Sequence, residues 1–142
     1  NYNKRISKNQ SYNNNRDAEK YFNDGLKKLQ SNDTNDLRLA RHYFKAAMAL
    51  SAESVSTNML LGEVSLKESQ LCSDATKNNK LTEAIYYYTN AIAIDSTCNL
   101  CYFSRGTCYY NIGDKKYLSD YRKSCASGYV DACAALKELK EE

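Results

Sequence analysis

The sequence has no proline, no tryptophan and only five glycines among its 142 residues, and its net charge is only +3. The lack of proline and the few glycines argue against β-sandwiches and barrels, which need many tight turns. No apolar run approaches the roughly 18 residues of a membrane-spanning helix, and the mean hydropathy is −0.72. A small charge spread along the chain does not indicate a nucleic-acid-binding protein. One small helical domain with neither a membrane span nor a nucleic-acid partner is therefore favoured.

The chain is instead rich in tyrosine, with 13 tyrosines beside three phenylalanines, which indicates an aromatic-rich interior or surface. Residues 1–16 differ from the rest, because they contain six asparagines and almost no periodic apolar residues. We expect them to form a polar N-terminal arm that is disordered on its own, ahead of one domain over residues 17–142. A polar segment like this can also follow a lipid anchor, so an anchor upstream stays open.

From Asp17 onward, apolar residues recur at the spacing of one helix face almost throughout. A polar gap is expected at residues 73–80, and Gly113 and Gly128 are expected to end helices. The expected helices cover residues 17–30, 37–50, 55–71, 81–94, 99–112, 115–126 and 129–142.

Two of these segments repeat each other, because residues 40–52 align without gaps on residues 84–96. The matched pairs are Ala40 with Ala84, Phe44 with Tyr88, Ala47 with Ala91, and Leu50 with Ile94. Small residues seven apart, with an aromatic ring between them, let two helices approach closely. An internal helical repeat is therefore expected.

The sequence resembles the tetratricopeptide repeat family in residues 102–114, where an aromatic residue, Gly106, Tyr109 and the turn glycine Gly113 follow that family's first helix. Ala84, Tyr88 and Ala91 resemble its second helix, and Gly25 and Gly62 can take the place of Gly106. The resemblance implies an all-α fold, a right-handed superhelical stack of three helix hairpins with a capping helix. The implied repeats cover about residues 17–53, 54–96 and 97–128, and the capping helix covers residues 129–142.

The resemblance also implies that the protein binds a protein or peptide segment in a concave groove lined by the first helix of each repeat. Phe103 and Tyr110 are expected there as an exposed aromatic pair. Lys67 and Asn111 alone are too few for the family's clamp on acidic C-terminal peptides. The expected groove residues are Phe22, Leu26, Met59, Glu63, Leu66, Lys67, Leu100, Phe103, Thr107, Tyr110 and Asn111. The alternative is a periplasmic or surface lipoprotein-type scaffold component of a larger assembly that binds through its convex faces and the N-terminal arm. An oligomer stays open for either role.

Catalytic and metal-binding patterns are weak in this sequence. The only histidine is His42, and the chain has no glycine-rich phosphate loop and no HExxH pattern. A zinc site needs two short-spaced cysteine pairs, and only Cys98 and Cys101 form one. Haem attachment is excluded because Tyr102 follows this pair, and a thioredoxin-like site would need strands. We expect no enzyme activity, no metal and no cofactor.

Six cysteines in 142 residues favour disulfides, although free buried cysteines remain the alternative. Cys125 and Cys133 flank the turn at Gly128, and an antiparallel hairpin would bring them within bonding range. Their spacing is similar to that of Sel1-like repeat proteins, relatives of the tetratricopeptide family. The resemblance implies an oxidising, extracytoplasmic location (periplasmic, cell-surface or secreted), and it leaves a bacterial source open. The other pairings are uncertain: Cys98 with Cys101 is feasible, and would leave Cys72 to meet Cys108.

Overall fold

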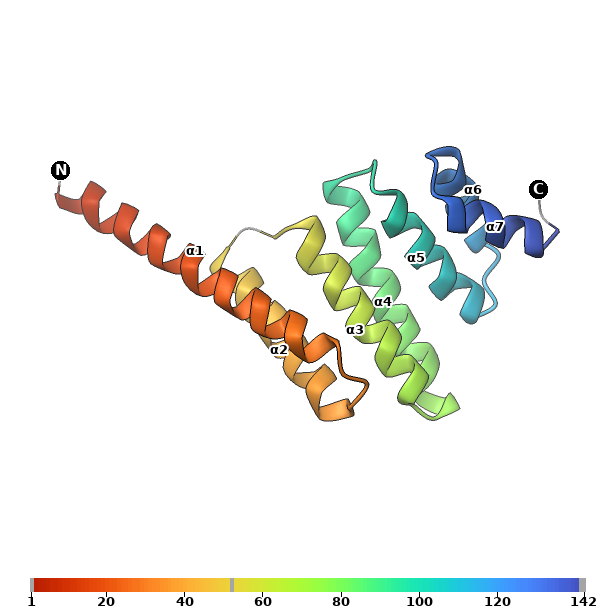
Figure 1. Ribbon diagram of the computed structural model, residues 1–142, viewed down its shortest axis with the longest axis horizontal. Coiled ribbons are helices and arrows are strands. Elements are labelled where there is room, and N and C mark those ends of the chain that lie inside the picture. The colour runs from red at the N-terminus through yellow and green to blue at the C-terminus, as the bar shows by residue number, and fades with distance from the viewer. Residues whose placement is uncertain (1, 52, 141–142) are drawn as a thin grey trace.

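The computed structural model describes residues 2–51 and 53–140, which form α-helices and no strand (Figure 1). The helices are α1 (Tyr2–Leu29), α2 (Thr34–Leu50), α3 (Val55–Leu71), α4 (Asp74–Ile94), α5 (Asn99–Asn111), α6 (Tyr117–Ala126) and α7 (Val130–Glu138). The expected all-α class is confirmed. None of these helices is both long enough and apolar enough to cross a membrane.

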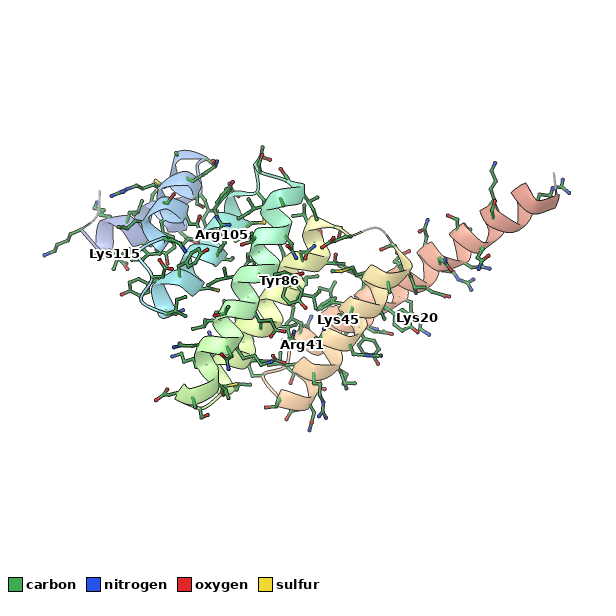
Figure 2. The ribbon with its side chains drawn as sticks, turned by 180° about the vertical axis from the view of Figure 1, so that it is seen from behind. Lys20, Arg41, Lys45, Tyr86, Arg105 and Lys115 are labelled. Atoms are coloured by element: carbon green, nitrogen blue, oxygen red, sulfur yellow. A yellow bond between two sulfur atoms is a disulfide. The ribbon has the colours of Figure 1, made fainter. Side chains whose placement is uncertain are left out.

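Each helix packs mainly against its neighbours along the chain, and the most extensive contacts join α1 to α2, α3 to α4, and α5 to α6. The fold is therefore a row of three hairpins followed by α7. In Figure 1, α1 and α3 lie on the near side, and α2 and α4 lie behind them. Figure 2 shows the opposite side, where Arg41 and Lys45 of α2 and Tyr86 of α4 face the viewer.

Two helices begin at least seven residues earlier than the sequence pattern indicates. The first begins at Tyr2 rather than near Asp17, and its N-terminal half projects beyond the hairpins (Figure 1). The fourth begins at Asp74, so most of the expected polar gap at residues 73–80 is helical. Apolar periodicity missed both stretches because it reports a buried face, and most of the side chains that the structure describes in residues 5–16 and 74–80 are exposed.

The same close contact occurs inside each of the three hairpins. A Cβ atom at Gly25 would lie 2.6 Å from the ring of Phe44, closer than real side chains approach. A Cβ at Gly62 would lie 2.8 Å from the Tyr88 ring, and one at Gly106 would lie 2.7 Å from the Tyr121 ring. Each glycine thus leaves space that an aromatic ring of the next helix fills. These three glycines therefore have a structural role, because they allow close contact between the two helices of each hairpin.

An ionic cluster ties the first hairpin to the second. The Arg41 guanidinium on α2 lies 2.6 Å from the Glu68 carboxylate on α3 and 2.7 Å from the Glu83 carboxylate on α4. Lys80 lies 2.7 Å from Glu68 as well. Burial raises the pKa of Glu68, but hydrogen bonds from Lys80 and Arg41 outweigh this and bring the pKa below its ordinary value. The cluster contains two positive and two negative side chains, so its charges balance.

Two disulfides lie in the C-terminal half of the fold. Cys98 and Cys101 are bonded at the start of α5, and Cys125 and Cys133 join α6 to α7. The alternative pairing of Cys72 with Cys108 is wrong, because both are free thiols. Cys108 lies fully buried beside Leu81, Ala84 and Tyr88, where burial raises the pKa of its thiol to about 12. Cys72 is half-buried and directly follows Leu71, the last residue of α3.

We expect Cys125 and Cys133 to be recovered as a bonded pair in non-reducing peptide maps of protein made under oxidising conditions. Replacing both with serine should lower the free energy of unfolding by about 2–3 kcal/mol, because the bond restricts the unfolded chain. Cys72→Ser is the matched control and should cost about 0.5 kcal/mol or less, since its half-buried thiol forms no bond. Recovery of Cys125 and Cys133 as free thiols from native protein would contradict the assignment.

Candidate functional site

A groove of about 530 Å³ runs across the first helices of the three hairpins. Most of its wall is apolar, and its polar groups are the Glu63 carboxylate and the hydroxyls of Ser56, Ser104 and Tyr88. The lining residues are Phe22 and Leu26 of α1; Ser56, Met59, Leu60, Glu63 and Leu66 of α3; Tyr88 of α4; and Leu100 and Ser104 of α5. The volume lies within the range of about 300–1,000 Å³ that is typical of ligand sites.

The structure brings together several groove residues that the sequence predicts. They come from three helices that are far apart in the sequence but share the wall of one groove. These residues are Phe22, Leu26, Met59, Glu63, Leu66 and Leu100. Their joint position follows from hairpin packing, because each hairpin presents its first helix on the same side.

The other predicted residues lie outside this groove. The Lys67 ammonium instead donates a hydrogen bond to the Leu29 carbonyl at the end of α1, at 2.7 Å. The Thr107 hydroxyl donates to the Phe103 carbonyl, at 3.0 Å. Tyr110 and Asn111 are exposed near the C-terminal end of α5. The register that the repeat implies is therefore followed in the first two hairpins and only at the start of the third.

Phe103 differs most from its expected position. It is half-buried, not exposed, because its ring stacks on Tyr121 at a centroid distance of 5.3 Å and contacts Tyr129 at 5.1 Å. Tyr110 is exposed as expected, and its ring meets the edge of Tyr117. The two residues therefore do not form an exposed pair. Phe103 is part of the packing among α5, α6 and the start of α7, which the apolar pattern of α5 alone does not reveal.

Sequence reasoning missed four residues of the groove wall: Ser56, Leu60, Tyr88 and Ser104. The Tyr88 side chain is only 3% exposed, yet its ring both fills the space over Gly62 and lines the groove. Burial is the main cause that raises the pKa of the Tyr88 phenol, with smaller contributions from Cys108 and Glu63. Tyr88 therefore stays neutral at physiological pH. The alignment of Phe44 with Tyr88 was the available signal for a ring at this depth.

Chemistry-bearing residues do not gather in the groove. Across residues 2–51 and 53–140, no group of three or more histidine, cysteine, aspartate or glutamate side chains is placed to hold a metal ion. His42 is exposed on α2 next to Tyr43, and it does not line the groove. The groove thus offers apolar contact area, the hydroxyls of Ser56, Ser104 and Tyr88, and one carboxylate.

Comparison with known proteins adds no family to this description. No protein-family model, curated protein or solved structure matches the chain significantly. Its interpretation therefore depends on the groove itself and on the repeated hairpins.

Proposed function

We propose that this chain is a non-catalytic interaction module that binds a peptide or protein segment in the groove across α1, α3 and α5. The observation that supports this proposal is the groove wall, in which apolar side chains from three hairpins share one surface. Leu100 is 38% exposed, and Phe22, Leu26, Met59 and Leu66 are half-buried. Partly exposed apolar side chains gathered in a concave surface are typical of binding sites.

The hairpin arrangement supports the same proposal at the level of fold. In our proposal the three hairpins stack as in tetratricopeptide repeats, in a right-handed superhelix with α7 as its cap. The repeated contacts of Gly25 with Phe44, Gly62 with Tyr88, and Gly106 with Tyr121 support this stacking. Grooves of this kind bind extended or helical segments through a few apolar anchors.

A scaffold role in a larger assembly is the second candidate, and the N-terminal half of α1 favours it. Residues 2–16 contain four basic residues and no acidic residue, and this half of the helix projects from the hairpins (Figure 1). A long polar helix with little tertiary packing is marginally stable in water, so a partner along it would stabilise it. We propose an extracytoplasmic location for either role, with which the two disulfides are compatible.

Filling the groove should weaken peptide binding strongly without unfolding the protein. Random 12-residue peptides displayed on phage are selected on the wild-type protein, and the strongest is synthesised and titrated. Ser56→Trp places a large ring at the exposed rim, so we expect its affinity for this peptide to fall about tenfold or more.

Ser119→Trp is the matched control, because Ser119 is also exposed on a helix but lies on α6, outside the groove. It should bind the selected peptide as wild type does. Equal affinity of all three proteins for every selected peptide would contradict the proposed groove. Selection that yields no peptide at all would contradict peptide binding.

A further inference from the structure

Glu63 is the one charged side chain in the described wall of the groove. It is half-buried on α3, one turn from Met59 and three positions from Leu66, both of which also line the groove. The neighbouring Tyr88 phenol, whose pKa Glu63 helps to raise, is neutral and nearly buried. A negative charge therefore lies in a mainly apolar surface.

The usual partner of such a glutamate is engaged elsewhere. A lysine four positions later on the same helix normally pairs with a glutamate, and Lys67 stands at that position. Its ammonium instead donates to the Leu29 carbonyl at the end of α1, at 2.7 Å. Within residues 2–51 and 53–140, Glu63 forms neither a hydrogen bond nor an ion pair with another side chain.

The contrast with the other half-buried or buried carboxylates is informative. Glu68 pairs with Arg41 and Lys80, and Asp120 pairs with Arg105 at 2.7 Å. A carboxylate that loses water without gaining a partner costs free energy, so a segment that covers the groove must supply a donor to Glu63 or expel it from the contact. The other polar groups of the described wall are the hydroxyls of Ser56, Ser104 and Tyr88.

We infer that the segment bound in this groove carries a lysine or arginine between two or three aliphatic side chains, and that this cation pairs with Glu63. In this proposal the aliphatic side chains of the bound segment contact the part of the wall that Phe22, Leu26, Met59 and Leu100 form. The groove thus selects basic amphipathic segments and rejects acidic ones. This inference rests on the proposed function, because it names the chemistry of the segment that the module binds.

The test compares the peptides selected by wild type with those selected by Glu63→Gln and Glu63→Lys, using the same random 12-residue phage library. Wild type should enrich lysine or arginine flanked by leucine, isoleucine, valine or phenylalanine. Glu63→Gln keeps the shape of the side chain and should lose the enrichment of basic residues, while it keeps that of aliphatic ones. Glu63→Lys should enrich aspartate or glutamate at the same place.

A charge exchange then measures the pairing directly with one synthetic peptide from the wild-type selection. Changing its basic residue to glutamate should weaken binding to wild type by about 10- to 100-fold, as expected for a hydrogen-bonded charge. Glu63→Lys should restore much of that affinity. Thermal melting of each protein variant shows whether it remains folded. A peptide whose basic residue is changed to alanine separates the loss of charge pairing from the repulsion that glutamate adds.

The results distinguish failure of the Glu63 inference from failure of the proposed function, which is peptide binding in the groove. Peptides that lose binding with Ser56→Trp but show no preference for charge at Glu63 would overturn this inference and leave the proposed function standing. Peptides unaffected by Ser56→Trp would overturn both. Sedimentation that shows a dimer in wild type but not in Ser56→Trp would assign the groove to a second copy of the chain, and would also overturn the inference.

Discussion

Tyr88→Ala should lower the free energy of unfolding by about 3–5 kcal/mol, as expected for removal of a large buried ring. The ring is 3% exposed, and it occupies the space that the missing side chain of Gly62 leaves between α3 and α4. A cavity there would separate Leu81 and Ala84 from the buried Cys108 of α5. The effect is measured by urea denaturation followed by circular dichroism at 222 nm.

Tyr86→Ala is the matched control on the same helix. Tyr86 is 62% exposed and contacts the ring of Tyr87, so its loss should cost about 1 kcal/mol or less. Equal losses in the two variants would show that α4 is rotated relative to the packing described here. If only Tyr86→Ala lowered the free energy of unfolding, the buried face of α4 would be the opposite one from that described here.

Arg41→Met should cost about 3 kcal/mol, because it removes the guanidinium that pairs with Glu68 and leaves that carboxylate mostly buried. The side chain of Glu68 is 11% exposed, and methionine fills a similar volume without supplying a charge. Lys80 remains beside Glu68, so the loss should fall short of the largest values known for broken buried pairs. Chemical denaturation at pH 7 gives the value.

The pH dependence of this difference follows from the lowered pKa of Glu68. A carboxyl group whose pKa is lower in the folded protein than its ordinary value of 4.5 stabilises the fold above that pH, and the contribution is lost as the pH falls through the folded-state pKa. The difference in the free energy of unfolding between wild type and Arg41→Met should therefore become smaller below about pH 4.5.

Arg38→Met tests whether charge removal alone explains the effect. Arg38 is exposed on the same helix and donates a hydrogen bond to Asn35, so its replacement should cost about 0.5 kcal/mol or less at any pH. If the loss of unfolding free energy caused by Arg41→Met stayed constant between pH 7 and pH 3, the ion pair of Glu68 described here would be contradicted.

Much of the fold could be predicted from the sequence, because buried faces leave a strong periodic pattern. The helix over residues 55–71 was predicted with the bounds that the structure shows, and Leu37, Ala40 and Phe44 lie in the core as their spacing indicates. The helical stretches before Asp17 and over residues 74–80 could not be predicted in this way. These stretches contain no apolar period, and residues 2–16 are rich in asparagine, a poor helix former.

The candidate site was predictable only as far as the repeat register held. Phe22, Met59 and Leu100 line the groove, and the family resemblance is what led us to expect them there. Phe103 could not be placed, since its burial depends on Tyr121 and Tyr129, which belong to other helices. The hairpins differ in the lengths of their helices and of their connecting turns. The apolar pattern of one helix therefore does not predict its contacts with other helices.

The most direct test of the groove as the binding site is a nuclear magnetic resonance map of amide shifts during titration with the selected peptide. The account predicts the largest shifts at Leu26, Met59, Glu63 and Leu100, with little change on the opposite side at Lys45, which Figure 2 shows. Shifts confined to the side of α2 and α4, or to the projecting half of α1, would contradict it and favour the scaffold role.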